Sequence, residues 1–457
     1  MSICTSILSK NHHLHVQKSL KERTHLAFKE LLLKEDIVLL VKEQKHRERV
    51  YTPEVTLWAF LSQVIEEDKS LQAAVTRVIA TAIANGEHIP SVNTSAYSQA
   101  RSNLKEESIS LLAQKTAQHV VEHLPKEWLW NHKQIKLVDG STVSMPDTQS
   151  NQEAYPQSRS QKAGVGFPIA RIVAIIDYAT GVLLDLALGP CRGKATGEHA
   201  LLRQLLPTLT SNDVLVGDRY YSSFFLIAAL IKQGVSAVFP LHHSRQPDFK
   251  TGTILGKKDH IVSWKKPVAK PNWMTREEYE AFPDEISVRE VAVEIKQPGI
   301  RTKTLILVST LLDSREASRT ALASLYSCRW FIELSLRAIK ETMNMNILRG
   351  KTPAMIRKEL WVHLLAYNLI RKWMAQAAWG AGKAVSTLSF KLTLQLLRPF
   401  DSFALLIDPQ QRTQLTQVIA SKTVANRSGR SEPRRVKRRP KPFPLLQMPR
   451  GFYKNGA

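Results

Sequence analysis

Four polar residues in the stretch 325–343 have types and spacings that could do chemistry together. They are Tyr326, Arg329, Glu333 and Lys340, at offsets of −7, −4, 0 and +7 from the glutamate. A helix turning about 100° per residue places such positions on one narrow stripe. A carboxylate between two cations, with a phenol beside them, can meet metal ions and phosphates. Periodicity alone also fits an ordinary solvated helix face with ion pairs between neighbouring turns.

A second stripe of the same stretch is apolar. Its members are Leu325, Ile332, Leu336, Ile339 and Met343. Helical spacing of apolar residues predicts a helix that packs onto a core along this stripe. We therefore expect one continuous helix over residues 325–343, with the polar stripe at its rim.

Two aspartates are further candidates because each ends a predicted strand. The β-branched and apolar run 135–138 ends in Asp139-Gly140, and the run 214–216 ends in Gly217-Asp218. A turn residue is the ordinary explanation for either aspartate alone. Asp177 and Asp213 compete with them, but both fall at ordinary turn positions beside strands.

The order of the predicted elements brings these acids together. Strand, strand, strand, helix, strand, helix and strand are expected over residues 135–138, 169–176, 182–188, 197–206, 214–216, 224–232 and 236–240. This order, closed by an acid-bearing helix, is that of the ribonuclease H-like fold, an α/β architecture with a mixed sheet. Its first and fourth strands are neighbours, so we expect Asp139 and Asp218 at one sheet edge, where the last helix brings Glu333.

The spacing Tyr-x2-Arg-x3-Glu-x6-Lys over residues 326–340 resembles the signature of the insertion-sequence-4 family of bacterial DDE transposases. The segments DGS at 139–141 and DRYYS at 218–222 are similar to the family's forms around its first two acids. The resemblance implies catalytic and metal-binding roles for Asp139, Asp218 and Glu333. It also supports contacts to DNA phosphates by Tyr326, Arg329 and Lys340.

Cleavage and transfer of a phosphodiester need an activated oxygen nucleophile, a stabilised leaving oxygen and neutralised phosphate charge. Two divalent ions, Mg²⁺ or Mn²⁺, can supply all three. We expect Asp139 to bridge both ions, with Asp218 and Glu333 each completing one. The predicted function is that of an insertion-sequence transposase, which cleaves DNA at the element ends and transfers the strand into target DNA. An inactive, transposase-derived DNA-binding protein and a ribonuclease H-like nuclease without joining activity are the alternatives.

The charge of the chain predicts an anionic partner. Lysine and arginine number 64 against 40 acids, a formal net charge of +24, which favours nucleic acid. The chain has no uninterrupted apolar run near 20 residues, so no membrane association is expected. The three scattered cysteines form no metal or disulfide pattern and fit the bacterial cytosol. The expected partners are double-stranded DNA, as terminal inverted repeats and target, and a second copy of the chain on the paired ends.

The expected organisation is a ribonuclease H-like core with an all-β insertion, preceded by a helical domain and followed by helices and a basic tail. The expected boundaries are a flexible N-terminus at 1–16, a helical domain recognising DNA ends at 17–130, the first part of the core at 131–245, a β-rich insertion at 246–313, the closing helix and C-terminal helices at 314–420, and a basic, proline-rich tail at 421–457.

Several residues outside the signature are possible DNA contacts. Trp264 and Trp273 of the insertion could stack on an extruded base, although core packing is the alternative for both. Arg219 follows the second aspartate directly. In the tail the candidates are Arg434, Arg435, Lys437, Arg438 and Arg439. A segment this basic cannot bury a core and is suited to lie along phosphates.

Overall fold

The computed structural model describes residues 50–86, 88–193, 196–294, 304–402, 409–424 and Met448. The chain divides into two compact units. The helical unit comprises Met1–His123 and Ala338–Val424, and the sheet unit comprises Leu124–Arg337 and Ala425–Ala457. The predicted flexible N-terminus at 1–16, the helices expected before residue 50 and the basic tail beyond residue 424, apart from Met448, lie outside the described residues.

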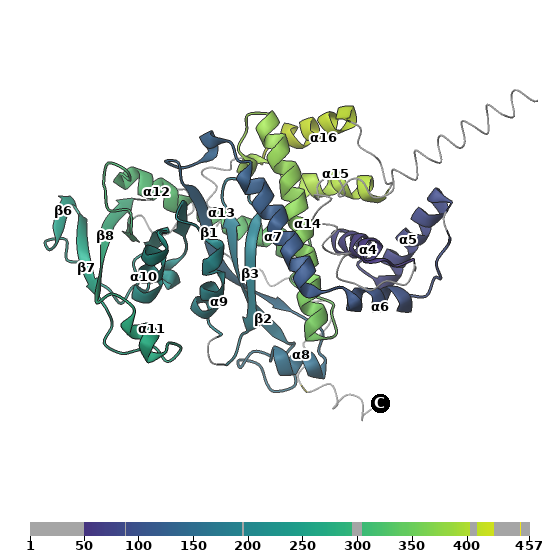
Figure 1. The fold of residues 1–457 in the computed structure, drawn as a ribbon, viewed down its shortest axis with the longest axis horizontal. Helices are drawn as coiled ribbons and strands as arrows, with labels where there is room; N and C mark the ends of the chain where they lie inside the picture. Colours follow the sequence, from purple (N-terminus) through teal and green to yellow (C-terminus); the bar gives the residue numbers. More distant parts are fainter. Residues whose placement is uncertain are drawn as a thin grey trace, which may run out of the picture. The chain divides into compact units, whose positions relative to one another are not determined.

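The sheet unit is built on one nine-stranded sheet in the order β3-β2-β1-β4-β5-β9-β8-β7-β6. In Figure 1 strands β6, β7 and β8 lie together at one side of this unit, and β2 and β3 lie at the other. Strand β4 runs parallel to β1 and to β5, and every other neighbouring pair is antiparallel. The strands are β1 Gln134–Ser144, β2 Ile169–Asp177, β3 Leu183–Pro190, β4 Asp213–Val216, β5 Ser236–Pro240, β6 Thr253–Gly256, β7 Asp259–Lys265, β8 Glu285–Glu294 and β9 Thr304–Ser309. The predicted adjacency of the first and fourth strands is confirmed.

Helices cover the sheet because its central strands are apolar on both faces. All four residues of β4 are buried, as are six consecutive residues at the end of β2. Helix α9 packs on β2 and β3, α10 on β5, α12 on β8 and α13 on β1. The helices of this unit are α8 Gln149–Ala154, α9 Glu198–Leu205, α10 Phe224–Gln233, α11 Arg276–Glu280, α12 Arg319–Ser327 and α13 Trp330–Arg337, with short 3₁₀ turns η1 Lys126–Trp128, η2 Leu206–Thr208 and η3 Arg219–Tyr221.

The strands expected between residues 252 and 313 are present as β6 to β9. They continue the same sheet, since β9 pairs with β5 through Val238↔Ser309 and the residues that follow. One short helix, α11, interrupts them, and a capping box at Thr275 fixes its start.

The prediction of one continuous helix over 325–343 is wrong. Helix α12 ends at Ser327, α13 begins at Trp330, and residues 338–342 form a π-helix, η4 Ala338–Thr342. At the first break the Ser327 hydroxyl donates to the Ala323 carbonyl at 2.9 Å, and the Cys328 thiol reaches the Ser324 carbonyl at 3.5 Å. Such side-chain bonds to the preceding turn bend helices. The backbone forms a tight turn here, in which the Arg329 N–H donates to the Tyr326 carbonyl.

The helical unit is organised around α14, a helix of 28 residues that packs against α4, α7, α15 and α16. Its elements are α4 Pro53–Ile65, α5 Leu71–Asn85, α6 Ser95–Asn103, α7 Glu106–Glu122, η4, α14 Pro353–Gly380, η5 Val385–Thr387, α15 Phe390–Ser402 and α16 Pro409–Ser421. Side chains of Thr52, Ser70 and Thr352 accept backbone N–H groups at helix starts. In the part of the chain that the structure describes, no helix is long and apolar enough to cross a membrane.

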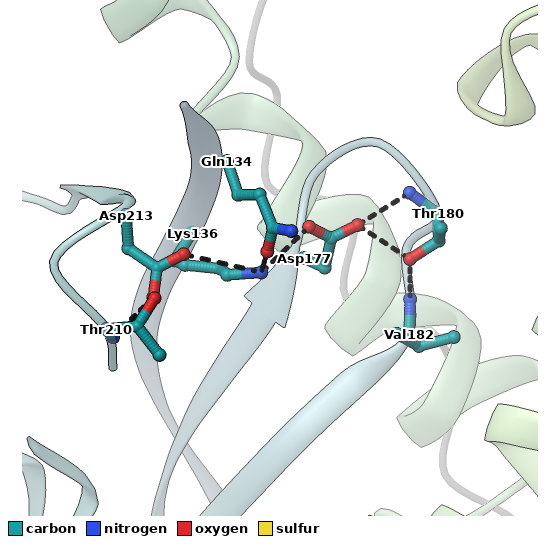
Figure 2. Close-up of polar contacts among 7 residues, drawn as sticks. All are labelled: Gln134, Lys136, Asp177, Thr180, Val182, Thr210 and Asp213. Atoms are coloured by element: carbon teal, nitrogen blue, oxygen red, sulfur yellow. Dashed lines mark hydrogen bonds and ion pairs between the residues drawn. The ribbon is translucent and has the colours of Figure 1, made fainter. Parts of the chain in front are cut away.

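A buried polar cluster ties three strands of the sheet together (Figure 2). Lys136 of β1 is 2 % exposed, and its Nζ lies 3.1 Å from Asp177 Oδ1 and 3.7 Å from Asp213 Oδ1. Asp177 also accepts the N–H and hydroxyl of Thr180, and Asp213 accepts the N–H of Thr210. Asp213 begins β4, whereas Asp218 follows its end. The competing aspartates Asp177 and Asp213 therefore lie at the end of the parallel strands that is opposite to Asp218.

Candidate active site

The sheet register places the first two candidate acids at the same level. Leu137 of β1 pairs with Val216 of β4, and Asp139 and Asp218 each lie two residues beyond this pair. Asp139 Oδ1 accepts the N–H of Gly140 at 2.8 Å. Asp218 Oδ1 accepts the N–H of Tyr220 at 2.7 Å and caps the short turn η3. Asp218 follows the end of β4, whereas Asp139 lies within β1, so the expected strand end before Asp139 is wrong. Each carboxylate is held by a nearby backbone N–H.

Arg329 connects the third candidate acid with the first. Its Nη2 lies 2.6 Å from Glu333 Oε1, one helical turn on, and its Nη1 lies 3.9 Å from Asp139 Oδ2. Helix α13 packs on β1, which brings these side chains to the edge of the strand. Burial raises the pKa of the Tyr326 phenol, and the charges of Arg329 and Asp218 also act on it. Arg329 thus lies beside Asp139 and Glu333, and Asp218 is close enough to act electrostatically on Tyr326.

The electrostatics of Asp139 show how closely the acids approach. Burial raises the pKa of Asp139 to about 6, against the opposing effects of the Gly140 N–H and Arg329. The charges of Asp218 and Glu333 contribute to this raised pKa. Arg329 keeps its proton because Tyr326, Glu333 and Asp139 together outweigh its desolvation and raise its pKa. The three carboxylates Asp139, Asp218 and Glu333 together carry more negative charge than the single guanidinium of Arg329 neutralises.

The donor set suits hard divalent cations, because it consists of carboxylate oxygens on the rim of a sheet. Within the described ranges no group of three acid, histidine or cysteine side chains is arranged to hold a single ion. A two-ion site needs only two protein carboxylates per ion, since substrate oxygens complete each shell. The donor chemistry of Asp139, Asp218 and Glu333, three carboxylates of which the latter two act electrostatically on the first, is compatible with such ions.

A further acid, Glu198, borders the same position and was missed by the sequence reasoning. It begins α9, and Gly140 lies so close that a Cβ on this glycine would come within 2.4 Å of Glu198 Cδ. Its Oε2 accepts the Tyr221 hydroxyl at 3.5 Å, and Arg171 Nε lies 4.0 Å from its Oε1. Burial raises the pKa of Glu198, and the nearby charge of Asp218 adds to this. The sequence did offer one signal for Glu198, because a helix is predicted to begin at residue 197, directly after the third strand.

The two candidate tryptophans have different surroundings. Trp264 is 4 % exposed, donates its indole N–H to Glu290 at 2.8 Å and has the Arg245 guanidinium 3.7 Å from its ring centre. It is a packed residue of β7. Trp273 is 42 % exposed, and Arg203 lies 3.5 Å over its ring.

Trp273 lines a cavity of about 820 Å³ between α9, α10 and the segment that leads into α11. Tyr220 and Phe225 contribute aromatic walls, and His199 also lines it. Tyr220 lies two residues after Asp218, so the cavity adjoins the second acid. Arg219, between them, is exposed.

The remaining candidates are Lys340 and five basic residues near the C-terminus. Lys340 belongs to the π-helix η4 of the helical unit, where burial lowers its pKa and Glu341 opposes the effect. Its part in the site stays a prediction. Arg434, Arg435, Lys437, Arg438 and Arg439 fall outside the described residues.

Comparisons with known proteins give three related findings. The family described as "Transposase DDE domain" matches residues 130–369. The chain is 28 % identical over 412 residues to "Transposase InsG for insertion sequence element IS4" of Escherichia coli (strain K12), covering 87 % of this chain and 88 % of that one. It is 26 % identical over 141 residues to "Putative transposase InsZ" of the same organism, covering 31 % and 46 %.

Among solved structures, the piggyBac transposase synaptic complex with hairpin DNA aligns with 86 % of this chain and 84 % of that chain. The TM-score is 0.44 and the sequence identity 12 %.

Proposed function

The chain belongs to the DDE transposase family, within the insertion-sequence-4 group, and from this we propose that Asp139, Asp218 and Glu333 are its three catalytic acids. The protein is an insertion-sequence transposase. The observation that supports the residue assignment is the position of Arg329 between Asp139 of β1 and Glu333 of α13, together with the electrostatic effect of Asp218, after β4, on Asp139.

We assign the first five strands to a ribonuclease H-like core. The support is the order β3-β2-β1-β4-β5, in which β1 lies antiparallel to β2 and parallel to β4. This arrangement puts the ends of two parallel strands side by side, which is how two aspartates far apart in sequence reach one position.

Asp139 would hold two divalent ions, Mg²⁺ or Mn²⁺, one shared with Asp218 and the other with Glu333. When bound, these ions neutralise the scissile phosphate and stabilise the attacking and leaving oxygens. Arg329 compensates the acids in the metal-free protein, and its guanidinium can bind phosphate oxygens when DNA is present. Tyr326 donates its hydroxyl to the DNA backbone, and Lys340 is the second cation for the flanking phosphates.

The reaction has two displacements at phosphorus. Water attacks the phosphodiester at the element end, and the bond to the 3′ oxygen breaks, which leaves a free 3′-hydroxyl. That hydroxyl then attacks a phosphodiester of the opposite strand or of the target, forms a new ester and displaces the 3′ oxygen of the phosphodiester that it attacks. The three acids hold the reacting groups in both steps, so one site serves both.

DNA would extend beyond the acids over nearby residues. Arg219 is exposed beside Asp218, and Trp273 offers a half-exposed indole in a cavity that adjoins it. Base stacking on Trp273 fits this position better than on Trp264, which is buried and hydrogen-bonded. The tail arginines and lysines would add phosphate contacts, and two copies of the chain would pair the two ends.

A cleavage and joining assay tests this function. The full chain is incubated with its element's end, target DNA and Mn²⁺, with Asp218→Asn in parallel. We expect 3′-hydroxyl ends and joined products from the native chain and neither from the variant, with DNA binding retained by both. Cleavage without joined product would favour the nuclease alternative. Binding without cleavage by the native chain would favour a DNA-binding protein.

A further inference from the structure

We propose that Glu198 is a fourth carboxylate of the catalytic site and takes part in binding the divalent ions there. The inference rests on the function proposed above and adds a residue that the three-acid signature does not contain. Three observations support it. Glu198 lies against Gly140, its hydrogen-bond and ion-pair distances are long, and it lies on helix α9, which carries none of the other three acids.

The position of Glu198 depends on a glycine directly after the first acid. A Cβ at residue 140 would lie 2.4 Å from Glu198 Cδ and 2.6 Å from its Oε1, distances that real Cβ atoms do not show. Gly140 therefore leaves room for the Glu198 carboxylate beside the backbone that holds Asp139. This close approach joins the N-terminus of α9 to the acid-bearing part of β1.

The partners of Glu198 do not occupy its carboxylate fully. The Tyr221 hydroxyl donates to Oε2 at 3.5 Å, and Arg171 Nε lies 4.0 Å from Oε1. Both distances are at the outer limit for such contacts. Arg171 instead makes a shorter bond of 2.9 Å to the Thr196 carbonyl. The Glu198 side chain is 29 % exposed, so its oxygens remain accessible to a cation.

Glu198 lies on a different element from each of the three proposed catalytic acids. Asp139, Asp218 and Glu333 come from β1, the end of β4 and α13, and Glu198 comes from α9, which packs on β2 and β3. The charges of Glu198 and Asp218 are close enough to affect each other. Tyr221, which is fully buried, lies near Glu198, Asp139 and Asp218 together. Glu198 thus lies beside Gly140, the residue after Asp139, and within electrostatic reach of Asp218.

Binding of Mn²⁺ to the full chain, measured by calorimetry in the absence of DNA, tests the proposal without relying on activity. Glu198→Gln keeps the shape and the hydrogen-bond acceptor and removes the charge. We expect roughly tenfold weaker Mn²⁺ binding. Glu153→Gln, an exposed glutamate of α8 in the same unit, is the matched control and should bind as the native chain does. Equal binding by Glu198→Gln and the native chain would overturn the proposal.

Two further variants separate metal binding from a purely structural role. Tyr221→Phe removes the hydroxyl partner and keeps the carboxylate, so Mn²⁺ binding should change far less than in Glu198→Gln. Gly140→Ala should push the Glu198 carboxylate away and weaken Mn²⁺ binding in the native background, but have little further effect on Glu198→Gln. Fully additive effects, or a Tyr221→Phe defect as large as that of Glu198→Gln, would contradict the proposal.

Glu333→Gln in the same experiment distinguishes failure of this proposal from failure of the proposed function. If Glu333→Gln loses Mn²⁺ affinity while Glu198→Gln keeps it, the fourth acid is wrong and the three-acid site stands. If the native chain neither binds Mn²⁺ nor cleaves DNA, both are wrong.

Discussion

The protonation of Asp139 links the pH to the stability of the chain. Its pKa is raised by burial to about 6, so between pH values of about 4 and 6 the folded chain holds a proton that the unfolded chain has lost. The unfolded state then binds fewer protons, and stability falls as the pH rises through this window. The loss persists at neutral pH in the metal-free protein.

Asp139→Asn should therefore stabilise the metal-free chain at neutral pH. We expect the free energy of unfolding at pH 7.5 in EDTA to rise by up to about 3 kcal/mol, since the pKa is raised from 3.8 to about 6 and each unit corresponds to about 1.4 kcal/mol. Denaturant unfolding measures this, and the gain should vanish near pH 4, where native Asp139 is protonated. A variant less stable than the native chain at pH 7.5 would contradict the electrostatic account.

Arg329→Gln should impair catalysis more than DNA binding. The guanidinium lies between Glu333 and Asp139, so its loss leaves these acids uncompensated and removes a phosphate donor. We expect DNA-end cleavage to fall by at least roughly tenfold at saturating Mn²⁺. Arg276→Gln breaks an exposed pair with Glu280 at the same spacing and should cleave normally. An equal loss in both variants would show that Arg329 has no particular role.

At the scale of elements, the parallel pair β1 and β4 positions the site, and Lys136 fixes that pair. Its ammonium lies between Asp177, at the end of β2, and Asp213, at the start of β4 (Figure 2). Burial raises the pKa of Asp213, and Lys136 opposes this by stabilising the carboxylate. The cluster thus fixes the relative positions of β1, β2 and β4. Lys136 precedes Asp139 along β1, and Asp213, at the start of β4, precedes Asp218.

Lys136→Met should destabilise the chain strongly, because it leaves two buried carboxylates facing each other without a cation. We expect a loss of about 3–5 kcal/mol in the free energy of unfolding. Lys232→Met, at an exposed position of α10, is the control and should change stability by under about 0.5 kcal/mol. Denaturant unfolding of both variants decides, and a loss below about 1 kcal/mol in Lys136→Met would contradict the assigned role.

The sequence locates strands β1 and β4, but the expected end of the first strand at residue 138 is wrong, because β1 continues through Asp139 to Ser144 in its pairing with β2. Apolar runs locate both strands, and fold topology then brings Asp139 to Asp218. The break before Trp330 is not visible in the periodicity, because hydroxyl and thiol bonds to the preceding turn cause it. Glu198 was missed for a different reason. Its place depends on the close approach of Gly140, a contact between segments that lie far apart in the chain.

At the scale of the molecule, positive charge is concentrated at the C-terminus. Residues 425–457 contain ten lysines and arginines and one glutamate, a surplus of 10 − 1 = 9 in a chain whose net charge is +24. Each phosphate neutralised on binding releases counterions, so these residues should contribute to the salt dependence of DNA affinity.

A chain ending at residue 424 should bind duplex DNA more weakly and with a smaller slope of log affinity against log salt concentration. Binding titrations between about 50 and 200 mM salt measure the slope. At the lowest salt, metal-dependent cleavage should be retained, because the three acids lie outside the deleted segment. An unchanged slope would show that the tail does not contact DNA.

The most direct test of the three catalytic acids is cleavage of the element's own end by the native chain and by Glu333→Gln, each with Mg²⁺ and with EDTA. Glutamine keeps the size of the side chain and removes its charge, and Glu280→Gln at an exposed position of α11 is the matched control. We predict metal-dependent 3′-hydroxyl ends from the native chain and the control, and none from Glu333→Gln, with DNA binding retained in all three. Equal cleavage by Glu333→Gln and the native chain would contradict the account.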